Sequence, residues 1–176
     1  MTEEPFRGYT ITHILDCLAD PAKIRVIAAA ERLVDDIFPY LNAILPNASY
    51  SPGANTLTIK REYRLITLYP HVAVMAKIDD EDDALAILAW LRDLINDAYA
   101  RREEITPCYE HRRMVGFLDV YRLLPATDCK ACGEATCLAF AVGLTEGRHD
   151  LADCPSLDAA HRERLASLLG QTVASQ

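Results

Sequence analysis

Apolar and charged positions alternate along the first quarter of the chain with a helical spacing. Between residues 24 and 45 the apolar residues recur at steps of three and four, and most of the charged residues lie on the opposite side. Asp20 and Pro21 form a typical helix start, because an Asp side chain can accept a hydrogen bond from a free backbone N–H and Pro fits the first helical position. The pattern predicts a helix over 21–44, with a bend near Pro39.

Three predicted strands follow a turn-rich stretch at 46–55. The segments 56–61, 63–69 and 72–78 are rich in β-branched and aromatic residues, and the last of them places its apolar residues at every second position. Their short connections favour an antiparallel meander.

A second helix is predicted after the acidic run at 79–83. Such a run is a candidate metal site or basic-partner site, but it directly precedes the apolar stretch 84–95, where carboxylates would complement the helix dipole. We interpret it as a helix start. Trp90 lies on the apolar face of this helix, which makes it a core residue.

The last third of the chain is predicted to be mostly helical, after a short strand at 114–121. An apolar run begins at residue 137, and 156–169 forms an amphipathic pattern closed by Gly170. The predicted fold class is therefore α+β. An N-terminal domain over 1–123, with a helix, a three-stranded antiparallel meander and a helix, precedes a small helical module over 124–176.

Composition limits the classes of function. The 176 residues are 51% hydrophobic and 25% charged, which is enough apolar surface for a packed core. The net charge of −8 argues against sequence-independent binding of nucleic acid or anionic lipid. No window approaches the roughly 18 apolar residues of a membrane span, and the first residues are acidic where a signal peptide is basic. We expect a soluble, cytoplasmic protein.

Four of the six cysteines lie in the C-terminal module. Cys129, Cys132, Cys137 and Cys154 have the spacing C-x2-C-x4-C-x16-C, and Pro155 follows the last of them. Four soft thiolates suit zinc or an iron–sulfur cluster. Zinc ribbons more often pair two C-x2-C knuckles, so the spacing favours iron–sulfur and leaves zinc as the alternative.

The residues around these cysteines carry a family resemblance. The stretch LPATDCKACGEATCLAFA at 124–141, followed by Cys154 and Pro155, resembles the [4Fe-4S] domain of the corrinoid iron–sulfur protein large subunit and of the B subunit of the Rnf electron-transport complex. The resemblance implies that Cys129, Cys132, Cys137 and Cys154 ligate one [4Fe-4S] cluster that passes single electrons at low potential. It covers neither a corrinoid-binding barrel nor further ferredoxin-like cysteine sets, and it does not extend to residues 1–123, for which the sequence identifies no family.

The other candidate residues are weaker. Cys17 and Cys108 stand alone, and a lone cysteine is usually a small buried hydrophobe. Cys108 and His111 could form a catalytic pair, but no oxyanion-hole motif or third member accompanies them. His149 lies in the segment that returns to Cys154, which could bring it near the cluster. No catalytic residue is predicted.

The sequence thus predicts single-electron transfer through one cluster, to or within a larger redox enzyme or metallocofactor system, with residues 1–123 as a docking or scaffold domain. One alternative is a non-enzymatic accessory or regulatory protein whose structural or oxygen-sensing cluster supports metalloenzyme assembly, and another is a structural zinc protein. The N-terminal domain has no Gly-rich nucleotide loop, histidine–carboxylate metal set or nucleophile motif, which favours a carrier or accessory subunit over an enzyme. The expected partner is a redox protein or a metalloenzyme complex.

Overall fold

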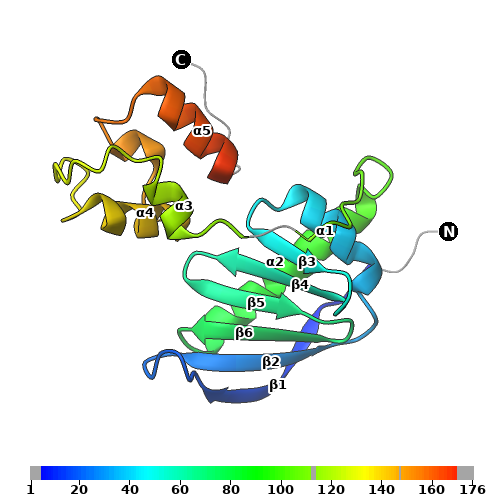
Figure 1. The fold of residues 1–176 in the computed structure, drawn as a ribbon. Helices are drawn as coiled ribbons and strands as arrows, with labels where there is room; N and C mark the ends of the chain where they lie inside the picture. The colour runs from blue at the N-terminus through cyan, green and yellow to red at the C-terminus, as the bar shows by residue number, and fades with distance from the viewer. Residues whose placement is uncertain (1–4, 112–113, 147, 170–176) are drawn as a thin grey trace. The chain divides into compact units, whose positions relative to one another are not determined.

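The chain forms two compact units, Met1–Arg112 and Arg113–Gln176, in a computed structural model that describes residues 5–111, 114–146 and 148–169 (Figure 1). The division falls before the boundary predicted after residue 123, because the helix α3 (Phe117–Tyr121) packs against α4 (Cys137–Thr145) in the second unit.

The first unit is built on a six-stranded antiparallel sheet with the strand order β1-β2-β6-β5-β4-β3. The strands are β1 (Tyr9–Asp16), β2 (Ile24–Ala30), β3 (Ala48–Ser51), β4 (Thr56–Arg61), β5 (Arg64–Leu68) and β6 (Val72–Ile78). A short 3-10 turn η1 (Asp35–Ile37), the helix α1 (Phe38–Ile44) and the long helix α2 (Glu81–Ala100) complete the unit. Its α+β class is as predicted.

The predicted helix over 21–44 is wrong for most of its length. Residues 24–30 form β2, which pairs with β1 and β6, and only η1 and α1 are helical. Val26 and Ala28 are fully buried and their neighbours are half-buried, which is the two-residue period of a strand. Leu33, which the helical pattern placed on the apolar face, is 53% exposed.

Asp20 begins a turn rather than a helix. Its Oδ1 accepts a hydrogen bond from the Ala22 backbone N–H at 3.0 Å, and its carbonyl accepts one from the Lys23 N–H at 3.0 Å. This side-chain turn joins β1 to β2, because an Asp side chain can bond the backbone two residues on as readily as it caps a helix.

The meander of β4, β5 and β6 is confirmed, with strands that match the predicted 56–61, 63–69 and 72–78 within a residue. The sheet is larger than predicted, because β1, β2 and β3 join it. The predicted turn region 46–55 contains β3, which pairs with β4 from Ala48 to Ser51.

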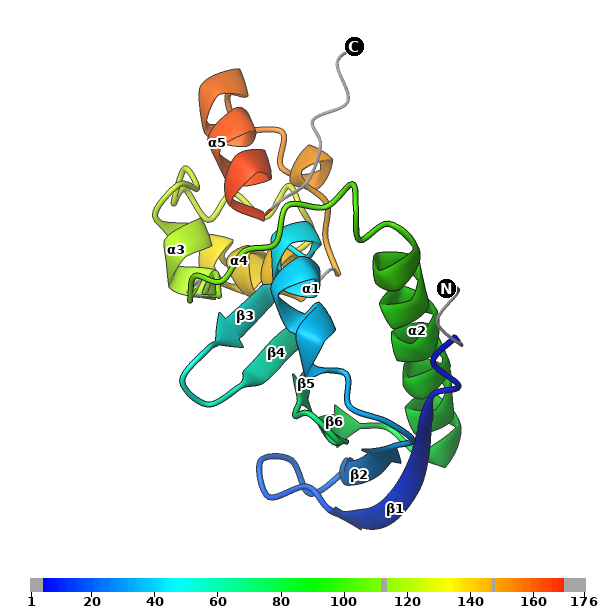
Figure 2. The ribbon, with the colours of Figure 1, turned by 90° about the vertical axis from the view of Figure 1, so that its right-hand side faces the viewer.

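The acidic run begins α2, as predicted. The Asp80 carboxylate accepts a hydrogen bond from the Asp83 N–H at 2.9 Å, and the Asp83 carboxylate accepts one from the Asp79 N–H at 3.0 Å. Figure 2 shows α2 along one side of the curved sheet. Its buried Leu91 and Ile95 pack with α1 and with alternate sheet residues to form the core of this unit.

The second unit contains α3, α4, a 3-10 turn η2 (Leu151–Asp153) and α5 (Ala159–Leu169). The predicted strand at 114–121 is wrong: the Asp119 carboxylate accepts a hydrogen bond from the Gly116 N–H at 3.0 Å and starts α3 instead. The helices predicted from residue 137 and within 156–169 are present as α4 and α5, and Gly170 lies outside the described residues. Within the described ranges, no helix has both the length and the apolar character to cross a membrane.

Candidate metal centre

The four cysteines of the motif come from three segments of the second unit. Cys129 and Cys132 lie in the cluster loop, which we define as residues 126–136; Cys137 is the first residue of α4, and Cys154 directly follows η2. Cys137 and Cys154 are buried, with 8% and 5% of their surface exposed, whereas Cys132 is half-buried and Cys129 is exposed. The site therefore has a buried side and a side open to solvent at Cys129.

Burial and neighbouring charge both affect the Cys154 thiol. Burial raises the pKa of Cys154, and repulsion from the negative charge of Cys132, Cys129 and Cys137 raises it further. Among the described residues, no group of three or more His, Cys, Asp or Glu side chains is arranged so that it could hold a metal ion.

The backbone of the cluster loop alternates between left-handed and ordinary conformations. Ala126, Asp128 and Lys130 have φ values of 53°, 48° and 60°, while the residues between them do not have positive φ. Gly133, with φ 85°, takes the sharp turn predicted after the second cysteine. Alternation of this kind turns successive N–H groups toward one side, which makes a concave binding surface for an anion such as an iron–sulfur cluster.

Hydrogen bonds favour the thiolate form of Cys129. Its pKa is lowered first by the Ala131 backbone N–H and then by the hydroxyls of Ser156 and Thr127. The Ser156 Oγ lies 3.6 Å from the Cys129 Sγ, so the segment after Cys154 reaches back to the first cysteine. Donors of this kind are the usual second layer around a metal-bound sulfur.

Cys137 occupies the N-terminus of α4, as predicted. The Thr136 hydroxyl accepts a hydrogen bond from the Ala139 N–H at 3.1 Å, and the Asp128 carboxylate accepts one from the Cys137 N–H at 2.7 Å. The positive end of the helix dipole stabilises a thiolate at this position.

An apolar wall backs the buried cysteines. Cys137 and Cys154 belong to one hydrophobic cluster with residues of α3, α4, η2 and α5, among them Phe140, Leu151 and Leu157. The thiols, the N–H groups directed at sulfur and the dry wall together fit an iron–sulfur cluster. The sequence alone did not identify Asp128 or Ser156, although one directly precedes the first cysteine and the other lies two residues after the last.

Cys17, Cys108 and His111 lie in the first unit. Cys17 is buried, in agreement with the interpretation as a small hydrophobe, and Cys108 is half-buried. The His111 Nδ1 lies 3.0 Å from the backbone carbonyl of Tyr50, so this ring is directed at the backbone of β3. The geometry gives no support to a catalytic pair with Cys108.

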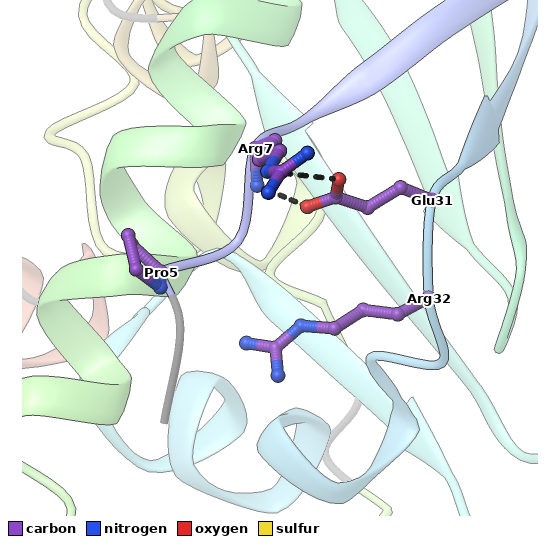
Figure 3. Close-up of a pocket in the computed structure, with 4 residues that line it drawn as sticks. All are labelled: Pro5, Arg7, Glu31 and Arg32. Carbon is purple, nitrogen blue, oxygen red and sulfur yellow. Dashed lines mark hydrogen bonds and ion pairs between the residues drawn. The ribbon is translucent and has the colours of Figure 1, made fainter. Parts of the chain in front are cut away.

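A pocket of about 300 Å³ in the first unit is lined by Pro5, Arg7, Glu31 and Arg32 (Figure 3). Both the backbone N–H and the guanidinium of Arg7 contact the Glu31 carboxylate, and the Arg32 side chain extends beside them. The Arg32 guanidinium also lies 5.0 Å from the centre of the Tyr99 ring. These interactions hold the charged side chains at the pocket in place.

Comparison with known proteins shows that a segment of the second unit is similar to iron–sulfur proteins. Residues 124–156 match the family described as "Putative Fe-S cluster". The chain is 50% identical over 56 residues to the acetyl-CoA decarbonylase/synthase complex subunit gamma of Methanothermobacter thermautotrophicus, which covers 32% of this chain and 12% of that protein. It is 40% identical over 57 residues to the corrinoid/iron-sulfur protein large subunit of Moorella thermoacetica, covering 32% and 13%.

The chain thus matches only about an eighth of the length of these curated relatives. No solved structure matches it significantly. The predicted resemblance of the C-terminal module to the iron–sulfur domain of the corrinoid iron–sulfur protein large subunit is confirmed.

Proposed function

We propose that this iron–sulfur module holds one [4Fe-4S] cluster through Cys129, Cys132, Cys137 and Cys154 and uses it for single-electron transfer. The observation that carries the proposal is that the four cysteines all lie within the segment matched by the iron–sulfur family, where the backbone of the cluster loop alternates. When bound, the cluster supplies a reversible one-electron couple.

Residues of the chain tune and protect that couple. The Ala131 N–H and the Ser156 hydroxyl donate to the Cys129 sulfur, and these hydrogen bonds stabilise the negative charge of the thiolate. The apolar wall around Phe140 excludes water from the side of Cys137 and Cys154. Four cysteine ligands leave no open position on the cluster, which favours electron transfer over catalysis at iron.

A redox partner would approach the module at Cys129. This cysteine is exposed whereas Cys137 and Cys154 are buried, so the shortest path between solvent and the cluster lies on its side. The named relatives are a subunit of the acetyl-CoA decarbonylase/synthase complex and a corrinoid/iron-sulfur protein subunit. By analogy, this chain delivers electrons within a larger metalloenzyme or metallocofactor system, and its first unit acts as the docking or scaffold domain.

The proposal also assigns the protein to a reducing compartment such as the cytoplasm. The two cysteines outside the proposed ligand set, Cys17 and Cys108, are free thiols, and free thiols persist where disulfide formation is disfavoured.

The test is anaerobic purification of the full chain, followed by iron, sulfide and zinc analysis, visible absorption, and electron paramagnetic resonance after dithionite reduction. We expect about four irons per chain and a reducible paramagnetic signal. Cys137→Ala should abolish the bound cluster, and Cys17→Ala is the matched control that should leave the iron content unchanged.

Two results would contradict the proposal. Zinc at about one per chain in a colourless protein would make the module a structural zinc site. A cluster that forms but cannot be reduced and reoxidised reversibly would rule out an electron carrier and favour a structural or oxygen-sensing role.

A further inference from the structure

His149 connects three parts of the second unit. Its Nε2 lies 2.8 Å from the Glu134 Oε1 in the cluster loop, and its Nδ1 lies 3.4 Å from the Asp153 Oδ2, one residue before Cys154. Its ring centre is 5.2 Å from that of Phe140 on α4. A carboxylate oxygen can only accept, so the Nε2–H donates to Glu134.

Gly143 makes room for this ring. A Cβ at position 143 would lie 2.3 Å from the His149 Cδ2, well inside van der Waals contact. Gly143 is within α4, where glycine is less favourable than alanine. Its place in the helix is therefore explained by the close approach of the imidazole and not by helix formation.

A second cation near Glu134 is less well placed to hold the loop. The Arg148 Nη1 lies 3.6 Å from the Glu134 Oε1, but Arg148 also pairs with Glu146 at 2.9 Å and half of its side chain is exposed. The His149 side chain is only 19% exposed. Exposed ion pairs contribute little, so the more buried contact of His149 carries more of the attachment.

We propose that His149 is a positioning residue that holds the cluster loop against the return segment. We define the return segment as residues 148–154, and Gly143 leaves the space that the His149 ring occupies. Glu134 lies between Cys132 and Cys137 in sequence, and His149 belongs to the segment that ends at Cys154, so the bond between them links the stretches that carry three of the four thiols. Movement of the Glu134 stretch away from the return segment breaks this contact. The inference rests on the proposed function, because it assigns the cluster to these cysteines.

The first experiment measures the rate at which a chelator removes iron from the anaerobically purified full chain. His149→Phe keeps an aromatic ring packed on Phe140 but loses the hydrogen bond to Glu134. Gly143→Ala leaves residue 149 a histidine but forces its ring away from α4. Both should release iron about tenfold faster, as expected for loss of a hydrogen bond to a charged group. The paramagnetic signal of the reduced cluster should stay the same, because the ligands do not change.

Two further variants separate positioning from general destabilisation. His149→Gln retains an N–H donor for Glu134 and should release iron at a rate closer to that of the unsubstituted chain. Gly116→Ala is the control for glycine replacement in the same unit, since its Cβ would meet only the Asp119 Oδ2 at 3.5 Å. In a double-mutant cycle, Glu134→Gln should add little to His149→Phe, because the two side chains share one contact.

A second measurement does not depend on iron. In the metal-free full chain, alkylation of the buried Cys137 and Cys154, followed by mass spectrometry of their peptides, reports how often the loop opens. It should be faster in His149→Phe and Gly143→Ala than in Gly116→Ala. Equal alkylation rates, or equal iron-release rates in a chain that holds its cluster, would overturn the inference. A chain without iron whose alkylation rates differ would refute the proposed function and leave the positioning role standing.

Discussion

The Asp128 carboxylate accepts a hydrogen bond from the backbone N–H of Cys137 across 2.7 Å. The residue before the first cysteine therefore fixes the start of the helix that carries the third. Asp128 itself has φ 48°, a left-handed conformation that Asp and Asn tolerate better than most residues. One side chain thus serves both the backbone of the cluster loop and the N-terminus of α4.

Replacing Asp128 should loosen the cluster. Asp128→Gly removes the acceptor without straining the positive φ, and we expect iron loss to a chelator to be about fivefold faster, which corresponds to a hydrogen bond worth about 1 kcal/mol. Asp128→Asn keeps a side-chain acceptor and should behave like the unsubstituted chain. Unchanged iron loss in Asp128→Gly would mean that this bond does not help to hold the loop.

Replacing Ser156 should change the reduction potential. Its hydroxyl lies 3.6 Å from the Cys129 sulfur, where a hydrogen bond to the thiolate would stabilise the more negative, reduced state of the proposed cluster. Ser156→Ala should therefore lower the potential by about 20–60 mV, the one-electron equivalent of a hydrogen bond of about 0.5–1.5 kcal/mol. Redox titration followed by paramagnetic resonance measures the shift, and Ser156→Thr is the control that keeps a hydroxyl. A potential that rises or stays constant in Ser156→Ala would show that the hydroxyl does not donate to this sulfur.

The part of the sheet that could be predicted is the part that local pattern determines. The strands β4, β5 and β6 follow one another with short turns, and their β-branched residues alternate at a period of two. In β2, the residues Ile24, Ile27 and Ala28 also satisfy a helical spacing, and seven residues are too few to separate the two periods. Its strand conformation is decided by pairing with β6, more than forty residues away in sequence.

For the candidate site too, the features set by short sequence spacings could be predicted and the contacts made across the fold could not. The four cysteines and Gly133 were predicted because their chemistry and conformation are specified by short spacings in the sequence. The side chains that surround them act across the fold: Ser156 meets Cys129 over 27 residues, and His149 meets Glu134 over 15. No local pattern marks such pairs, so the sequence placed His149 in the segment that returns to Cys154 but could not identify its partners.

The start of α2 offers a stability test in the first unit. The Asp80 side chain accepts from the Asp83 N–H, and Asp80→Ala should lower the free energy of unfolding by about 1 kcal/mol, a typical value for loss of an N-cap. Asp80→Ser retains a capping oxygen and should lose much less. Urea unfolding followed by fluorescence of Trp90 measures this unit, because Trp90 is the single tryptophan and lies on α2. Equal stability of the Ala and Ser variants would show that the cap contributes nothing.

A charge network ahead of α2 should make the stability of the same unit depend on pH. The Asp79 carboxylate contacts Lys23, Tyr63 and Arg64, and the hydrogen bond from Lys23, followed by that from Tyr63, lowers the pKa of Asp79. A carboxyl group whose pKa is lower in the folded state stabilises the fold above its unfolded pKa of about 3.9. That contribution is lost as the pH falls through the lower, folded value.

Asp79→Asn should therefore reduce the free energy of unfolding at pH 7 by less than about 1 kcal/mol, because the carboxylate is about one-third exposed and solvent screens its charge. The difference from the unsubstituted chain should narrow below about pH 4, and at pH 7 it should shrink with added salt. Lys23→Met should overlap with Asp79→Asn rather than add to it, since both remove the same ion pair. If the difference in free energy of unfolding stays constant between pH 7 and pH 2, as followed by Trp90 fluorescence, Asp79 stabilises the unit by its packing and not by its charge.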